Sequence, residues 1–106
     1  MSKKLCKISF YVPETHLEKV KSALFAIGAG KYDNYDSCSW QTLGEGQFRP
    51  LRGSRPYIGQ VEKVEKVSEY KVEMICSEDL VQSAIAELKA SHPYEEPAYE
   101  IYAIFV

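Results

Sequence analysis

The first quarter of the chain shows two hydrophobic periods, one after the other. From Leu5 to Val12 apolar and polar residues alternate, which is the period of a strand with one buried face. Pro13 ends this pattern, and from Glu14 to Ile27 apolar residues recur at spacings of three and four, as on a helix with one apolar stripe. Gly28-Ala29-Gly30 then supplies a helix stop, because glycine tolerates positive φ. The sequence therefore predicts a strand followed by a helix.

The middle of the chain carries weaker signals. Residues 38–42 alternate as a short strand would, and Gly44-Glu45-Gly46 predicts a turn. Leu51 to Gln60 contains two glycines and a proline, so we expect loop or sheet-edge structure there. A clean strand pattern starts at Tyr70 and continues to Cys76.

The clearest helix signal lies between residues 77 and 93. Ser77 is a favourable N-cap, and the two acidic residues after it suit the positive end of the helix dipole. Pro93 ends the helix, because the residue before a proline disfavours helical geometry. The expected buried stripe consists of Leu80, Val81, Ala84, Ile85 and Leu88. A last strand follows, and one of its faces carries Tyr99, Ile101, Ala103 and Phe105.

The expected order is strand, helix, a hairpin region rich in strand signals, strand, helix and strand. Two strand–helix–strand halves predict an α+β fold, the ferredoxin-like βαββαβ sandwich, with both helices on one face of an antiparallel sheet. We expect the whole chain, residues 1–106, to form a single domain. The strand positions expected to face the helices are Cys6, Ile8 and Phe10, then Tyr70, Val72 and Met74, then Ile101, Ala103 and Phe105.

The opposite face of the predicted sheet mixes charged residues with tyrosines and isoleucines. A face exposed to water does not need these apolar side chains beside its ions, whereas a face shared with another subunit uses both. The alternative is a solvated face with scattered apolar residues, which is common on protein surfaces. We favour an oligomer. The residues concerned are Lys7, Ser9, Tyr11, Lys71, Glu73, Ile75, Glu100, Tyr102 and Ile104.

Charge and composition exclude several classes of protein. The 106 residues carry 13 Lys and Arg against 15 Asp and Glu, a formal net charge of −2. A dedicated nucleic-acid-binding domain usually has a basic excess that displaces counterions from phosphates, and this chain has none. No apolar run approaches the roughly 20 residues that a membrane-spanning helix needs, and the N-terminus lacks a signal-peptide pattern. We therefore expect a cytoplasmic protein that binds neither nucleic acid nor membrane.

Cysteines and histidines give little support for catalysis. Cys6, Cys38 and Cys76 are widely spaced and form no CxxC motif, and we expect the first and the last of them to be small buried strand residues. With two histidines in the chain, a nucleophilic triad would depend on His92, and no serine or cysteine is marked as its partner. His16 lies in the first turn of the predicted helix, so we expect it at the surface. The chain is not expected to be an enzyme.

The first segment that an ordinary sandwich does not need runs from Gly44 to Gly59. Its glycines and prolines fix a specific path for the backbone. Arg49, Arg52 and Arg55 on such a loop could grip an anion bidentately. The phosphate-binding pattern GxxxxGK followed by Ser or Thr is absent, as is GxGxxG after a strand. The alternative is an extended hairpin that packs on a neighbouring subunit.

The second such segment is Ser91-His92-Pro93-Tyr94-Glu95-Glu96-Pro97-Ala98-Tyr99. Its two prolines hold it extended and bring an imidazole close to two carboxylates, groups that ligate divalent metals or transfer protons. These three side chains are too few for a closed metal site, so Cys38 or another subunit would have to add ligands. The alternative is that His92 caps the helix and that the segment is a structured connection. The candidate ligand-binding residues are Gln47, Arg49, His92, Glu95 and Glu96, and the candidate metal ligands are His92, Glu95 and Cys38.

In this order, the motifs resemble one family. Gly-x-Gly-Gln-Phe-Arg-Pro, Gly-Ser-x-Pro-x-Ile-Gly, Val-Glu-Lys-Val and His-Pro-Tyr-Glu-Glu-Pro-Ala-Tyr are similar to the domain inserted into YqfO-type (NGG1p-interacting-factor-like) dinuclear-metal-centre proteins. The resemblance extends from Leu5 to Phe105 and implies a stand-alone copy of that domain. Its fold is similar to the CutA and PII proteins, which are trimers. CutA proteins also carry a His-Pro-Tyr segment followed by acidic residues near the last strand.

The metal centre of that family does not carry over with the resemblance. YqfO-type proteins bind two metals through His, Asp and Glu residues of the flanking domain, to which a cyclohydrolase activity has been attributed, and this sequence does not contain that domain. The resemblance implies the fold, a homotrimer, and a role in ligand sensing or metal binding. We therefore expect a non-catalytic oligomeric binding or regulatory module, in which His92 and a glutamate hold a divalent metal or a small molecule and Arg49 holds an anionic group. The competing expectation is a copper- or zinc-binding protein, as CutA proteins are suspected to be, or an assembly module that joins a separate metal-centre protein.

Overall fold

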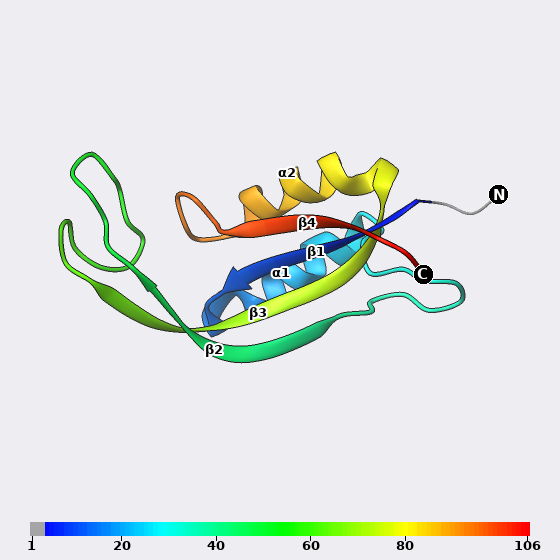
Figure 1. Cartoon of the computed structure of the whole chain (residues 1–106), viewed down its shortest axis with the longest axis horizontal. Coiled ribbons are helices and arrows are strands. Elements are labelled where there is room, and N and C mark those ends of the chain that lie inside the picture. The colour runs from blue at the N-terminus through cyan, green and yellow to red at the C-terminus, as the bar shows by residue number, and fades with distance from the viewer. Residues whose placement is uncertain (1–3) are drawn as a thin grey trace.

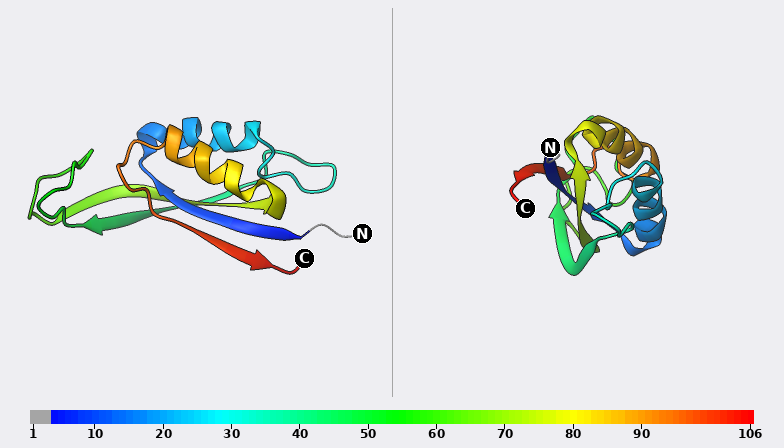
Figure 2. Two further views of the ribbon diagram at one scale, coloured as in Figure 1. Left: turned by 90° about the horizontal axis from the view of Figure 1, so that it is seen from above. Right: turned by 90° about the vertical axis from the view of Figure 1, so that its right-hand side faces the viewer.

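Four antiparallel strands form one sheet, and both helices lie on the same face of it (Figure 1; Figure 2, left). The structure, a computed structural model, describes residues 4–106. The sheet order is β2-β3-β1-β4, which confirms the ferredoxin-like α+β sandwich predicted from the sequence. No helix within residues 4–106 is long and apolar enough to cross a membrane. The elements are β1 (Leu5–Val12), α1 (Glu14–Ala26), β2 (Trp40–Phe48), β3 (Glu65–Ser77), the 3-10 turn η1 (Glu78–Leu80), α2 (Val81–Ser91) and β4 (Tyr99–Ile104).

The alternation predicted for β1 builds the centre of the core. This strand pairs with β3 on one side and with β4 on the other. Every second residue of β1 therefore lies beneath the helices, whose own apolar stripes have the predicted spacing. Cys6 and Cys76, which pair across the two strands, are buried free thiols as predicted. The main core cluster consists of Ile8, Phe10, Val12, Leu17, Val20, Leu24, Ala29, Val72, Met74, Cys76, Ala84 and Leu88.

The last strand contributes less to the core than its pattern predicts. Tyr99 and Ile101 pack against the core, but Ala103 is exposed and Phe105 is fully exposed. Ala103 pairs with the buried Cys6 and so lies on the predicted face without being covered there. The prediction that Phe105 faces the helices is wrong. The reason is the register, because Leu5 and Ile104 form the last pair between β1 and β4. Phe105 lies beyond that pair, where β1 no longer runs beside it.

The strands β2 and β3 extend past the rest of the sheet as a two-stranded ribbon. Residues 70–77 of β3 pair with β1, whereas residues 65–69 pair with β2 alone. The predicted turn at Gly44-Glu45-Gly46 is wrong, since these residues lie inside β2 and pair with β3. A side chain at Gly46 would collide with the carboxylate of Glu69, so this glycine permits a close approach rather than a turn. The ribbon makes the molecule elongated, with extents of 51 × 24 × 23 Å.

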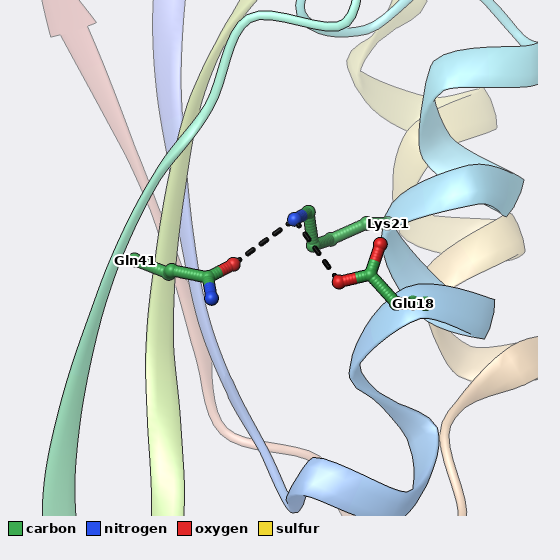
Figure 3. A network of polar contacts seen from close by, with 3 residues as sticks. All are labelled: Glu18, Lys21 and Gln41. Atoms are coloured by element: carbon green, nitrogen blue, oxygen red, sulfur yellow. Dashed lines mark hydrogen bonds and ion pairs between the residues drawn. The ribbon is translucent and has the colours of Figure 1, made fainter.

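A small polar network joins α1 to the edge strand β2 (Figure 3). The ammonium group of Lys21 donates to Gln41 Oε1 at 3.0 Å and lies 3.4 Å from Glu18 Oε2. The Glu18 carboxylate is exposed, so we expect the ion pair to contribute at most about 0.5 kcal/mol. The contact to Gln41 holds the start of β2 beside the helix.

The loop after α1 depends on a glycine that no other residue can replace without strain. Gly30 has a φ of +77°, and a Cβ there would stand 2.8 Å from a ring carbon of Phe25 and 2.9 Å from the carbonyl oxygen of Cys38. We expect Gly30→Ala to lower the free energy of unfolding by about 2–4 kcal/mol, through left-handed strain and steric overlap together. Gly53, with a φ of +99° in open space, provides the control, and Gly53→Ala should cost only about 1–2 kcal/mol. Denaturant unfolding measures both losses, and equal losses would contradict the role of close packing at Gly30.

Candidate functional site

The two segments singled out in the sequence meet at one end of the sheet. The ribbon loop (residues 49–64) joins β2 to β3, and the His92 segment (residues 92–98) joins α2 to β4; both lie toward the left in Figure 1. The backbone N–H of Arg55 donates to Glu95 Oε1 at 3.0 Å. The ring of Tyr94 lies 6.3 Å from that of Phe48 and 6.2 Å from that of Tyr57, measured between centroids. The two segments therefore meet within a single chain.

A cavity of about 270 Å³ lies between the ribbon loop and the His92 segment. Its wall is mostly apolar and aromatic, and three carboxylates reach it. A concave, mainly apolar surface with a few polar groups is typical of small-molecule sites. The aromatic residues of the wall are Tyr11, Phe48, Tyr57 and Tyr94, and its charged or amide residues are Gln47, Glu69, Glu95 and Glu96.

One hydrogen bond fixes the floor of the cavity to the sheet. The Tyr94 hydroxyl donates to Glu69 Oε2 at 3.3 Å. Burial raises the pKa of the Glu69 carboxyl above its ordinary value, although the hydrogen bond from Tyr94 acts in the opposite direction. Burial, followed by the neighbouring Glu69, raises the pKa of Tyr94 to about 12, so the phenol keeps its proton at neutral pH. The bare backbone of Gly46 leaves the space that Glu69 occupies.

His92 lies behind the cavity wall and binds the backbone through both ring nitrogens. It is 7% exposed and occupies the C-cap position of α2, which confirms the alternative that it ends the helix. The backbone N–H of Tyr94 donates to Nδ1 at 3.1 Å, so Nδ1 is unprotonated and Nε2 carries the hydrogen that it donates to the Tyr11 carbonyl oxygen at 2.6 Å. Burial lowers the pKa of His92, only partly offset by the bond to Tyr11. This neutral tautomer has no lone pair left for a metal.

The structure brings some of the predicted site residues together and leaves others apart. Gln47, Glu95 and Glu96 line the cavity, whereas Arg49 is exposed and is not part of the wall. The expected grip of Arg49 on an anion therefore has no geometric support in this cavity.

Cys38 does not meet His92 and Glu95 within one chain. Cys38 precedes the start of β2, and Phe48 at the far end of that strand lines the cavity. The nine residues of β2 span about 30 Å at the rise of an extended strand. Within residues 4–106 no group of three or more His, Cys, Asp or Glu side chains is arranged to hold a metal ion. A metal site that uses ligands from several chains stays a prediction.

The sequence did not point to several residues of the site. Glu69 is one glutamate among many in an alternating strand, and its position against Tyr94 depends on a register that the sequence does not display. Tyr57 lies in the ribbon loop, and its ring also meets the edge of the His16 ring at 5.9 Å. His16 is therefore half-buried rather than on the open surface as expected. Aromatic residues inside a segment rich in glycine and proline are the one sequence signal that could have indicated Tyr57.

No protein-family model matches the chain, but curated relatives do. Over 100 residues it is 41% identical to a protein of Halalkalibacterium halodurans described as a GTP cyclohydrolase 1 type 2 homolog. The alignment covers 94% of this chain and 27% of the relative. A Bacillus subtilis protein with the same description is 39% identical over 100 residues, covering 94% of this chain and 27% of its own length. The chain spans about a quarter of the length of these relatives.

Several solved structures are also similar to this chain. The Bacillus cereus protein related to NIF3 matches with a TM-score of 0.85 and 34% identity, over 98% of this chain and 26% of that protein. CutA1 from Oryza sativa matches with a TM-score of 0.73 and 15% identity, over 99% of this chain and 84% of that one. GlnK from Bacillus subtilis matches with a TM-score of 0.64 and 16% identity, over 95% of this chain and 85% of GlnK. The chain thus has the fold of CutA1 and GlnK, and its sequence is similar to one segment of much larger proteins.

Proposed function

We propose that this chain is a non-catalytic binding or regulatory module whose ligand occupies the cavity between the ribbon loop and the His92 segment. It would be equivalent to the segment that it matches in the larger relatives. The observation that carries the proposal is the meeting of two remote segments around one concavity, joined by the Arg55–Glu95 hydrogen bond and by the contacts of Tyr94 with two other rings. Such a preformed wall reduces the ordering cost of binding.

The surroundings of the two histidines support a non-catalytic role. His92 is buried and holds two backbone groups, so it is a structural residue. His16 Nδ1 lies 2.9 Å from the hydroxyl of the adjacent Thr15, and its ring rests against Tyr57. Neither imidazole is presented to the cavity as a general base.

The description of the curated relatives concerns proteins about three and a half times as long as this chain. We assign any cyclohydrolase chemistry to the remainder of those proteins and a binding role to the part that this chain represents. Incubation of the chain with GTP is expected to leave the nucleotide intact. Conversion of GTP would contradict the non-catalytic part of the proposal.

We further propose that the chain self-associates through the open face, defined as the sheet face opposite the helices, as a homotrimer of the CutA and PII type. Trp40 is 70% exposed and Tyr102 is 52% exposed on this face. Ser9, at its centre, is 1% exposed, and within residues 4–106 its hydroxyl has no hydrogen-bond partner. The Ser9 hydroxyl is covered by its own chain, so the support for association comes from the two exposed rings, since aromatic residues are enriched at contacts between subunits.

Binding at the cavity can be tested with 2-phenylethanol, a neutral aromatic probe small enough for the space. In a ¹⁵N-NMR titration we expect shifts confined to the ribbon loop, the His92 segment and the neighbouring part of β3. Tyr57 is 54% exposed, so Tyr57→Ala should leave the fold intact while weakening binding by about fivefold through the loss of one aromatic wall. Tyr35→Ala, which removes a 72% exposed tyrosine away from the cavity, should leave binding unchanged. Absence of binding, or shifts elsewhere, would contradict the assignment of the site.

A further inference from the structure

The charged residues that line the cavity are all acidic, although Arg49 and Arg55 neighbour lining residues along the chain. Glu69, Glu95 and Glu96 line it, and no Lys, Arg or His is among the lining residues. Glu95 already accepts one hydrogen bond, from the backbone N–H of Arg55, and this bond brings no formal charge. The cavity is therefore suited to a positive rather than a negative group.

The Glu69 carboxylate has no counter-ion within residues 4–106. Its carboxylate is half-buried and accepts one hydrogen bond, from the neutral phenol of Tyr94. Within residues 4–106 no salt bridge to Glu69 is present. Burial of a carboxylate without a cation disfavours the charged form, in agreement with its raised pKa. A cation bound beside Glu69 would offset this cost.

The aromatic wall favours the same charge. The ring of Tyr94 neighbours those of Phe48 and Tyr57, with centroid separations of 6.3 Å and 6.2 Å. A cation within about 6 Å of a ring face is attracted by the negative face of the π-system, and the attraction grows when water is excluded. An ammonium or guanidinium group beside these rings would meet both π-faces and carboxylates.

We propose that the cavity binds a small organic cation, a protonated amine or guanidinium attached to an apolar body. The apolar body would contact the aromatic rings, and the charged head would lie toward Glu69 and the rim glutamates. The volume of about 270 Å³ is slightly below the usual range for ligand pockets, which favours a small molecule. This inference rests on the proposed binding function of the cavity and specifies its ligand class.

Three probes of nearly the same shape isolate the effect of charge: 2-phenylethylamine is a cation, 2-phenylethanol is neutral and phenylacetate is an anion. At constant ionic strength near neutral pH, we expect the amine to bind about tenfold more tightly than the alcohol, and phenylacetate to bind most weakly. Equal binding of the three, or tightest binding of phenylacetate, would overturn the cationic assignment while leaving the cavity as a site. If none of the three binds, the proposed function fails as well.

Glu69→Gln tests the residue directly. Glutamine can still accept the hydrogen bond from Tyr94 but carries no charge. We expect this variant to reduce the preference for the amine over 2-phenylethanol to about twofold or less, whatever its effect on the affinity for the alcohol. Glu87→Gln removes another half-buried carboxylate, on α2 and outside the cavity wall, and should keep the full preference. An unchanged preference in Glu69→Gln would contradict the role of Glu69.

Discussion

Tyr102→Arg is expected to reduce the mass of the protein in solution from about three times 12.1 kDa to that of one chain. Tyr102 lies on the open face and is 52% exposed in the single chain, where a surface substitution usually changes stability by no more than about 0.5 kcal/mol. If a second copy covers that face, the guanidinium is buried without a partner, and the association is lost. Sedimentation equilibrium measures the mass.

Tyr35→Arg is the matched control for this experiment. Tyr35 is 72% exposed in the loop between α1 and β2, outside the sheet. The same tyrosine-to-arginine change there should leave the mass at the wild-type value. A wild-type protein that sediments as 12.1 kDa at all concentrations, or a Tyr102→Arg variant with the wild-type mass, would contradict association through the open face.

Replacement of His92 by alanine should lower the free energy of unfolding by about 2–4 kcal/mol, because it leaves the half-buried Tyr11 carbonyl and Tyr94 N–H without partners and removes a buried ring. It should also change how stability depends on pH. In the folded protein burial lowers the pKa of His92 below 6.5, whereas the unfolded chain takes up the proton near 6.5. The unfolded state then binds more protons, so the contribution of His92 is complete above pH 6.5 and is lost as the pH falls through 6.5 towards the lower folded value.

Urea unfolding at a series of pH values between about 7 and 5 measures this dependence. The decline attributable to His92 should disappear in His92→Ala and persist in His16→Ala, which removes the other histidine. The raised pKa of Glu69 makes the folded state more stable as the pH falls, which opposes the effect of His92. The quantity to compare is therefore the difference between the two variants in how the free energy of unfolding changes with pH. His92→Gln, whose amide both donates and accepts, gives the same comparison if the alanine variant does not fold. Identical slopes in the wild type and the His92 variants would contradict the neutral, buried histidine.

The elements with one buried face could be predicted from the sequence. In β1 and in the second half of β3 every second residue is buried, and in both helices the apolar stripe lies on the core. The ribbon could not be predicted in this way, because most of β2 is exposed and the first residues of β3 have no helix above them. For this reason the sequence predicted the strand only from Tyr70, although β3 begins at Glu65. For the same reason Gly44 and Gly46 were interpreted as a turn, although they lie inside β2.

The two segments that form the candidate site could be singled out from the sequence, but the chemistry of the site could not. The glutamates of the His92 segment do line the cavity. The arginines suggested an anion site, yet the ribbon loop presents the backbone N–H of Arg55 to Glu95, and Arg49 is outside the wall. A sequence shows which side chains a loop carries, whereas the direction in which each one points depends on the packing around it. The acidic and aromatic character of the cavity follows from that packing.

The most direct test of the account is whether the ribbon loop and the His92 segment enclose the cavity in the free protein. Nuclear Overhauser effects between the ring protons of Tyr94 and those of Phe48 and Tyr57 report this contact without any ligand. We predict that both sets of cross-peaks are present, because the ring centroids are 6.3 Å and 6.2 Å apart. Their absence, with a ribbon loop that is mobile on the nanosecond timescale, would contradict the existence of a preformed site.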